Sequence, residues 1–255
     1  MLKILACFKW VIDDADIKVE AASKRLILDR AGFKISDYDR NAIEEAVRLQ
    51  EQHGGTVAAM TVTTPTAKAC LKDALSRGPD AAYFINDPSY ADLAPAQTTS
   101  VLAAAIASGI EYDLIICGEG SGDLYAQQVG PALAEMLGIP CVTCVNKLSY
   151  ADGEITADRK LEDGIETVAV KLPALVTILP DINSARIPTL KQVLGAAKKP
   201  VHNLGPDTLG PVCDCRLHTD AIIAATMDRK QRKFAADSDG IRAAVATLMK
   251  EGVIA

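Results

Sequence analysis

The chain has 255 residues, of which 49% are hydrophobic and 24% charged, and its formal net charge is −6 at pH 7. This length suffices for one large α/β domain, or for one domain with a substantial extension. The acidic balance argues against a general binder of nucleic acid or of anionic membranes, and no apolar run reaches the ~18 residues that a membrane span needs. The N-terminal stretch MLKILACFKWV lacks the long apolar core of a signal peptide, so we expect a cytoplasmic protein.

The seven cysteines fit that compartment, and their odd number argues against a disulfide framework. Cys141 and Cys144 form a C-x-x-C within a strand-like alternation, and no second pair of matching spacing follows. Cys213 and Cys215 lie near His218, which leaves a metal site as the alternative, but we interpret the thiols as structural and expect no metal. Three further cysteines lie in or beside apolar runs, where a thiol behaves as a small buried hydrophobe: Cys7, Cys70 and Cys117.

Strands and helices alternate through the first part of the chain. Short apolar runs predict buried parallel strands, and longer stretches with one apolar face predict the helices between them. This alternation is typical of a doubly wound parallel sheet, so we predict the α/β fold class. In chain order we expect a strand at 2–8, a hairpin or long excursion at 17–36, a helix from Ser36–Asp39 to Gly54-Gly55, a strand at 56–62, a helix at 66–77, a strand at 81–85, a helix at 94–108, a strand at 114–116 and a helix at 132–137.

The stretch 113–140 is the one most suggestive of a ligand. Its apolar run stops at Cys117-Gly118, and a turn with three glycines leads to Gly130-Pro131 and a helix. Free backbone N–H groups and a helix N-terminus then lie together, as in α/β proteins that hold phosphates. A tight solvated loop is the alternative, since neither a dinucleotide fingerprint nor a P-loop is present. Lys9, in the predicted loop 9–14 after the first strand, either meets a phosphate or is solvated.

The pattern changes in the second half. Short alternating runs over 141–180, separated by turns such as Asp152-Gly153, predict a flanking β-meander that continues or borders the sheet. Five prolines between 180 and 211 predict an extended C-terminal segment outside the core. The last expected elements are two helices, one at 219–233, whose basic run 229–233 we interpret as a solvated face, and one at 237–250.

The most specific part of the chain is 159–199, which reads RKLEDGIETVAVKLPALVTILPDINSARIPTLKQVLGAAKK. It resembles the signature of the β subunit of electron-transfer flavoproteins: an Arg, G-x-E-x-V/L, L-P-A-V/L-x-T, an Asn, Arg-x-Pro-Ser/Thr-Leu and Ala-Lys-Lys. The resemblance continues upstream in NAIEEAVRLQE, ALSRGPDAA and GSGDLYAQQVGP. The segments GDLYAQQVG and GAAKKPV are most similar to the Fix-type branch, whose members work in electron-bifurcating complexes. The matching residues are Arg159, Gly164, Glu166, Leu172, Pro173, Ala174, Thr177, Asn183, Arg186, Pro188, Thr189, Leu190, Ala197, Lys198 and Lys199.

The resemblance implies a heterodimer with a flavin-bearing α subunit. Such a protein passes electrons between NADH or an acyl-CoA dehydrogenase, or a similar flavoenzyme, and other carriers through FAD, without a catalytic side chain. In simple members the β-subunit site holds a structural AMP, whereas in the bifurcating branch it holds a second FAD that accepts hydride from NADH. A scaffold that binds only AMP, and a stand-alone adenine-nucleotide-binding or -hydrolysing enzyme of similar architecture, stay open as alternatives.

The resemblance also implies a Rossmann-like adenine-nucleotide site at the strand ends. Carried over by position, the nucleotide lies along Ala6, Phe8, Lys9, Ser36, Val62, Thr63, Thr64, Cys117 and Gly118. The phosphates meet Asp123, Gln127, Gln128, Val129 and Gly130. Tyr38 matches an aromatic residue that approaches the α-subunit flavin in some members.

Three positions depart from the family pattern. Asp14 stands where some members have a second aromatic near the α-subunit flavin, and Lys160 stands where an acidic residue is common. Glu119 stands where simple members have Lys or Arg. A negative charge beside a diphosphate costs affinity, so we expect Glu119 to face solvent or a backbone amide.

Leu190 matches a leucine that inserts into a hydrophobic pocket of a partner dehydrogenase, although packing on its own subunit is the alternative. Lys191, Lys198 and Lys199 would then form a basic rim toward an acidic partner surface. We accordingly divide the chain into a nucleotide-binding domain, 1–190, and a C-terminal extension, 191–255, that packs on the partner subunit.

Overall fold

The structure is a computed structural model that describes residues 1–211, 219–224 and 231–254. The chain divides into two compact units, Met1–Lys18 with Ile27–Ala221, and Val19–Leu26 with Ile222–Ala255. The smaller unit contains α7 (Ser238–Lys250), which begins where the Asp237 side chain accepts a hydrogen bond from Gly240 N at 2.7 Å. The helix predicted at 237–250 is therefore confirmed.

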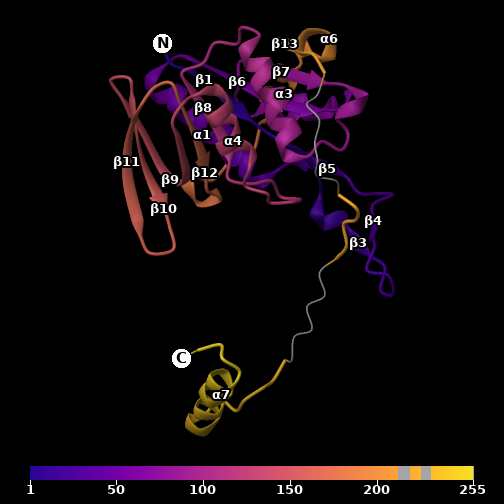
Figure 1. Cartoon of the computed structure of the whole chain (residues 1–255), viewed down its shortest axis with the longest axis vertical. Coiled ribbons are helices and arrows are strands. Elements are labelled where there is room, and N and C mark those ends of the chain that lie inside the picture. The colour runs from indigo at the N-terminus through magenta and orange to yellow at the C-terminus, as the bar shows by residue number, and fades with distance from the viewer. Residues whose placement is uncertain (212–218, 225–230, 255) are drawn as a thin grey trace. The chain divides into compact units, whose positions relative to one another are not determined.

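A nine-stranded sheet forms the centre of the larger unit, in the spatial order β11-β10-β9-β12-β8-β1-β6-β7-β13 (Figure 1). From β9 to the edge strand β13 the neighbours are parallel, and β10 is antiparallel to both β9 and β11. The strands are β1 (Lys3–Cys7), β6 (Thr56–Thr63), β7 (Ala81–Asn86), β8 (Leu114–Gly118), β9 (Cys141–Ala151), β10 (Glu154–Lys160), β11 (Ile165–Lys171), β12 (Ala174–Ile178) and β13 (Val201–Leu204).

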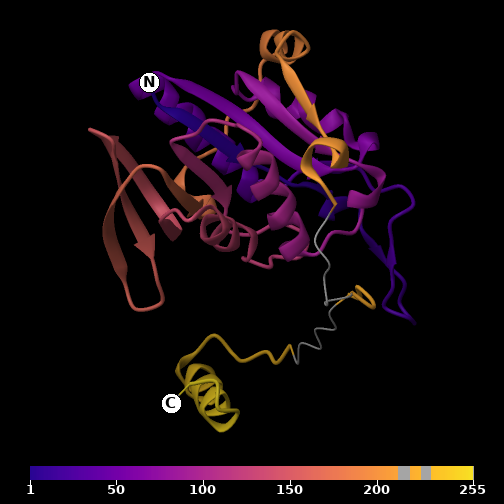
Figure 2. The ribbon, with the colours of Figure 1, turned by 45° about the horizontal axis from the view of Figure 1, so that its top comes forward.

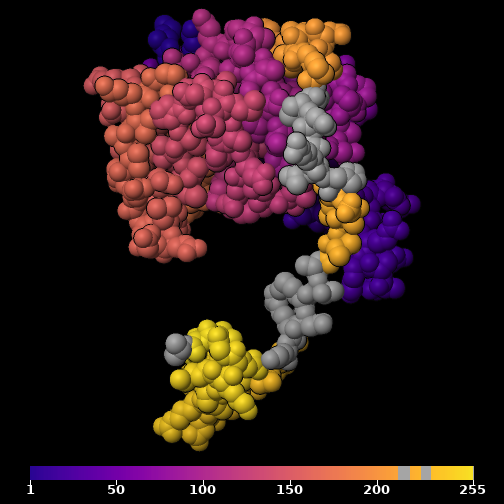
Figure 3. Space-filling model, in the orientation of Figure 1, coloured from indigo at the N-terminus to yellow at the C-terminus, as the bar shows by residue number. Residues whose placement is uncertain are grey.

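Helices cover both faces of this sheet (Figure 2). Because side chains alternate along a strand, Ile4 packs with the buried faces of α1 and α2, whereas Leu5 packs with α3 and α4. In the space-filling view the atoms of the larger unit form a continuous surface over these strands and helices (Figure 3). The predicted α/β fold class is confirmed. The helices here are α1 (Asp37–His53), α2 (Ala69–Ser76), α3 (Pro95–Ala107), α4 (Val129–Leu137), α5 (Leu190–Ala196) and α6 (Pro206–Leu209).

Helix α1 begins at the acidic residues and ends at the glycine that the sequence predicts as its limits. Asp37 and Asp39 lie in its first turn, where the helix dipole favours acidic side chains. Gly54 follows its last residue with φ of +73°, a conformation that glycine adopts without strain. Its inward face buries Ile43 and Leu49, which hold the helix against the sheet.

The excursion predicted at 17–36 is present, but the loop predicted at 9–14 contains a strand. β2 (Trp10–Ile12) pairs antiparallel with β5 (Phe33–Ile35), and β3 (Lys18–Val19) pairs with β4 (Leu26–Ile27). The rings of Trp10 and Phe33 stack with centroids 6.4 Å apart. These strands form through pairing between residues distant in the sequence, so a local hydrophobic pattern does not predict them.

The predicted meander is correct for β9, β10 and β11, and Asp152 and Gly153 form its first turn with φ of +49° and +80°. β12 differs, because it returns to the parallel core and lies between β9 and β8. Its five residues are all buried, so the strand belongs to the central layer and does not border it.

The segment predicted as extended and outside the core is the main error of the sequence prediction. It contains α5, whose Ala196 is buried beside Leu75 and Ala82, and β13, which pairs in parallel with β7. The boundary expected at 190 thus falls at the start of α5, and packing of 191–255 on a partner subunit stays a prediction. The helix predicted at 219–233 is absent from the described parts 219–224 and 231–233. The rest of that predicted helix, which includes Arg229 and Lys230, lies outside the described residues. The cysteines and the histidine considered for a metal site also lie outside them: Cys213, Cys215 and His218.

Candidate functional site

One buried carboxyl group joins the carboxyl ends of β1 and β8. Asp39 accepts a hydrogen bond from Lys9 N at 2.8 Å through Oδ2 and from Gly118 N at 3.2 Å through Oδ1. Burial raises the pKa of Asp39 to about 7, against the opposing effect of these two hydrogen bonds. The sequence prediction missed this residue, because an acidic residue in a first helical turn has an ordinary explanation as a dipole partner.

The same helix start also holds the glycine-rich loop. Ser36 is fully buried, and its Oγ accepts a hydrogen bond from Gly122 N at 3.2 Å. The rings of Tyr38 and Tyr125 lie with centroids 5.2 Å apart, at a tilt of 44°. The loop after β8 is thereby fixed to the first turn of α1, which brings the predicted residues Ser36, Tyr38 and Gly118 together.

Lys9 and Asp123, predicted to serve a phosphate separately, form an ion pair in the structure. Lys9 Nζ lies 2.6 Å from Asp123 Oδ2. Asp123 also accepts hydrogen bonds from Ser121 Oγ and, at 2.8 Å, from Leu124 N. Burial opposes ionisation of Asp123, but the ion pair and these hydrogen bonds outweigh it and lower its pKa. A bound phosphate would have to share Lys9 with this carboxylate.

Glu119 is half-buried, and its carboxylate is bonded to side chains of its own loop, whereas the sequence suggested that it faces solvent or a backbone amide. Its carboxylate accepts hydrogen bonds from Tyr125 Oη at 2.8 Å and from Gln127 Nε2 at 2.6 Å. Tyr125 and Gln127 both have left-handed backbone conformations, with φ of +47° and +56°. The carboxylate thus joins two side chains of the loop 119–128 and closes the loop.

Helix α4 begins directly after this loop and lies close to β12. A Cβ on Gly130 would lie 2.4 Å from Thr177 Cγ2, so only glycine allows this approach. The predicted residues Gln128 and Val129 stand at this helix start. Of the others, Ala6, Phe8 and Cys117 are buried around the strand ends, and the end of β6 and the turn after it supply Val62, Thr63 and Thr64 at the same edge.

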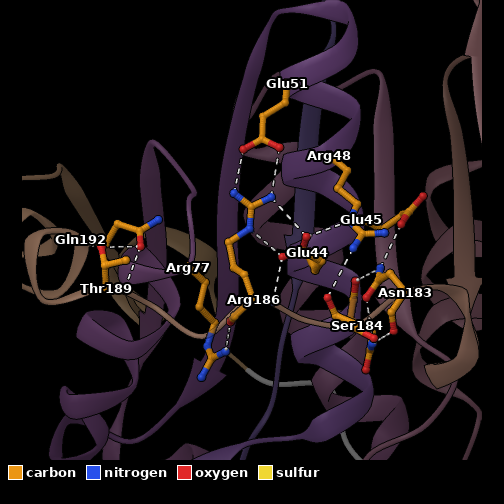
Figure 4. Close-up of polar contacts among 11 residues, drawn as sticks. Glu44, Glu45, Arg48, Glu51, Arg77, Asn183, Ser184, Arg186, Thr189 and Gln192 are labelled. Carbon is orange, nitrogen blue, oxygen red and sulfur yellow. Dashed lines mark hydrogen bonds and ion pairs between the residues drawn. The ribbon is translucent and has the colours of Figure 1, made fainter.

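A second cluster fixes the signature segment to the other end of α1 (Figure 4). Arg186 forms ion pairs with Glu44 and Glu51, each at 2.7 Å, and Arg48 pairs with Glu44 at 2.8 Å. These carboxylates raise the pKa of Arg186, Glu51 having the larger effect. Burial opposes ionisation of Glu44, but the hydrogen bonds from Arg186 and Arg48 lower its pKa.

Asn183 completes the attachment of this segment. It donates a hydrogen bond to Glu45 at 2.9 Å and one to Asn41 O at 3.1 Å, and it accepts one from Asn41 Nδ2 at 2.8 Å. Burial raises the pKa of Glu45, and the bond from Asn183 only partly opposes this. The signature residues Asn183 and Arg186 are thus anchors between two parts of one chain.

Beyond these anchors the segment exposes apolar side chains. Ile187, Leu190 and Leu194 are 91%, 76% and 65% exposed, so Leu190 does not pack on its own subunit. Thr189 caps α5 and exchanges hydrogen bonds with Gln192. Of the three lysines predicted as a rim, Lys191 and Lys198 are exposed.

Lys199, the third lysine, is directed at its own chain. Its Nζ donates to the carbonyl oxygens of Leu75, Gly78 and Pro79 at 2.9, 2.9 and 2.6 Å, and burial lowers its pKa. The lysine therefore satisfies carbonyl groups at and beyond the end of α2.

Arg159 and Glu166, two further signature residues, brace the meander. Arg159 donates to Thr143 O at 3.0 Å and pairs with Glu166 at 2.9 Å across the β10–β11 ladder. Lys160, which departs from the family pattern, pairs with Asp181 at 3.1 Å.

None of the helices in the described part of the chain has the length and apolar character that a membrane crossing requires. In the comparison with protein families, residues 25–209 match a model described as the electron transfer flavoprotein domain. The match spans most of the chain and includes α1, the loop 119–128 and the signature segment. The chain therefore belongs to the electron transfer flavoprotein family.

Proposed function

We propose that this chain is the β subunit of a heterodimeric electron-transfer flavoprotein. It would pass electrons to other carriers from NADH, from an acyl-CoA dehydrogenase or from a similar flavoenzyme, or in the reverse direction. Because its segments GDLYAQQVG and GAAKKPV resemble the Fix-type branch, we propose that it acts in electron bifurcation. The observation that carries the proposal is the edge where Asp39, Lys9, Ser36 and the loop 119–128 meet, at the carboxyl ends of β1 and β8. Such an edge is where open α/β sheets bind nucleotides.

The residues at this edge suit an adenine nucleotide. Backbone N–H groups at the start of α4 and the ammonium group of Lys9, which is paired with Asp123, would neutralise phosphates. FAD bound here would supply hydride and single-electron transfer, while the chain would set its position and exclude water. AMP in the same place is the alternative and would make the site structural.

The exposed segment around Leu190 supports the proposed dehydrogenase contact. Ile187, Leu190 and Leu194 present apolar side chains on a segment held by Arg186 and Asn183. A rigidly held apolar anchor loses little conformational entropy on binding. The ion pairs to α1 therefore prepare the segment for a hydrophobic pocket on a partner.

The test is to co-express this chain with a candidate α subunit, purify the complex and count the nucleotides that denaturation releases. Two FAD per heterodimer and no AMP would support a redox-active site in this chain. One FAD with one AMP would favour the single-flavin alternative, and one FAD with no second nucleotide would overturn the site. Nucleotide-dependent phosphate release would instead favour a stand-alone hydrolase.

A pair of matched variants locates the second nucleotide. Lys9→Met removes the ammonium group after the carboxyl end of β1, whereas Lys3→Met removes one at the amino end of the same strand, where Lys3 pairs with Glu111. We expect Lys9→Met to release the nucleotide of this chain and Lys3→Met to retain it. Equal retention in both would place the site elsewhere.

A further inference from the structure

Glu119 is the residue of the 119–128 loop that a phosphate site does not explain. A carboxylate next to a phosphate is repelled by it, yet Glu119 is held against the loop by hydrogen bonds from Tyr125 Oη at 2.8 Å and Gln127 Nε2 at 2.6 Å. The thiol of Cys144 also points to it, at 3.7 Å. The carboxylate therefore occupies donors that an anionic ligand would use.

The ammonium group of Lys9, beside the loop, already has a carboxylate partner as well. Lys9 Nζ lies 2.6 Å from Asp123 Oδ2, so its charge is balanced before any ligand arrives. A phosphate entering the loop consequently meets two carboxylates and a lysine that is already paired. Each further negative charge on the ligand raises the electrostatic cost of entry.

We propose that Glu119 is a specificity-determining residue: a fixed anion of the loop that disfavours nucleotides ending in a phosphate monoester and so favours those whose phosphates are diesters. A terminal monoester carries one negative charge more than the same phosphate in a diester. The inference rests on the nucleotide site proposed above and assigns Glu119 a role within it.

A purely structural role for Glu119 makes a different prediction. If the carboxylate only closed the loop through Tyr125 and Gln127, its loss would weaken all nucleotides alike and independently of salt. If it acts through its charge, its loss changes the ranking of nucleotides, and salt screens the effect. The two roles are thus separable by measuring a ratio of affinities.

ADP and ADP-ribose are the probes that isolate this charge, because they share the adenosine diphosphate group and differ in whether its terminal phosphate is esterified. Both are titrated by calorimetry into the full chain after removal of nucleotide by high-salt dialysis. Glu119→Gln removes the charge but keeps an oxygen that accepts from Tyr125, and Glu119→Asp keeps the charge. Glu135→Gln, an exposed position on α4, is the matched control for net charge.

The wild-type chain should bind ADP-ribose more tightly than ADP. In Glu119→Gln this preference should fall roughly tenfold, through tighter ADP binding, and added salt should reduce the difference. Glu119→Asp and Glu135→Gln should keep the wild-type ratio. An unchanged ratio in Glu119→Gln would overturn the inference and leave the site standing, whereas a wild-type chain that binds neither nucleotide would overturn both.

Discussion

The carboxylate of Asp39 lies 3.2 Å from the amide nitrogen of Gly118 and joins the first turn of α1 to the end of β8. Its second oxygen accepts from Lys9 N, at the end of β1. A Cβ on residue 118 would lie 2.5 Å from Asp39 Oδ1, so the contact requires glycine there. Two neighbouring strand ends are thus held by a single buried group, and the geometry of the proposed nucleotide site depends on it.

Asp39→Asn should destabilise the fold and weaken nucleotide binding. An amide replaces one acceptor oxygen with a donor, so one of the two backbone N–H groups loses its partner, at a cost of about 1–3 kcal/mol. Urea unfolding of the variant and the wild type measures this. Asp163→Asn, in the exposed turn between β10 and β11, should leave stability unchanged; equal stability of all three proteins would contradict the role given to Asp39.

The stability difference between wild type and Asp39→Asn should depend on pH. The pKa of Asp39 is raised from 3.8 to about 7 in the folded state, so between these values the folded state binds the extra proton. The free energy of unfolding of the wild type should therefore fall, relative to the variant, by roughly 2–4 kcal/mol as pH rises from about 4 to about 7, and level off above. Denaturant titrations at several pH values test this, and a difference that rises with pH would refute it.

Arg186→Leu should loosen the signature segment. Glu44 is buried, and removal of Arg186 leaves it with Arg48 as its ion-pair partner, at a cost of roughly 2 kcal/mol in the free energy of unfolding. Hydrogen exchange of 183–194 should accelerate as well. Lys160→Ala breaks an exposed ion pair with Asp181 and should change stability by less than about 1 kcal/mol.

Gly130→Ala should destabilise the chain, and Thr177→Ser should rescue it. The added Cβ would lie 2.4 Å from Thr177 Cγ2, and overpacking of this kind costs about 1–3 kcal/mol. Serine lacks that methyl group but keeps the Oγ that accepts from Cys144 N at 3.4 Å. Thermal unfolding of the two single variants and the double variant gives the interaction free energy between the two substitutions. A double variant no more stable than Gly130→Ala would show that the clash lies elsewhere.

Leu190→Ala should leave folding intact and slow electron transfer from the dehydrogenase. The side chain is 76% exposed, so its loss removes little packing within the chain, but a central anchor contributes about 2 kcal/mol or more to an interface. Steady-state kinetics of the assembled heterodimer with a partner dehydrogenase should show at least a roughly tenfold loss in kcat/KM. Ile165→Ala, exposed on β11, is the control and should behave as wild type.

Local patterns alone determined most elements of this protein. Continuous apolar runs marked β1, β6, β7 and β8, because strands buried on both faces carry apolar residues throughout, and Asp152-Gly153 marked its turn through the positive φ that both residues adopt. The glycine-rich loop and the signature segment were likewise visible as short motifs, since their residue types follow from backbone geometry and from anchoring contacts.

Only the tertiary structure decided which elements meet. The insertion of β12 between β9 and β8, and the pairing of β13 with β7, depend on hydrogen bonds between segments far apart in the chain, which leave no local period. For the same reason the roles of Asp39 and Glu119 could not be read from the sequence. Both are ordinary acidic residues in the sequence; folding removes Asp39 from water and bonds Glu119 to two side chains of its own loop, and these surroundings are the basis of the roles proposed for them.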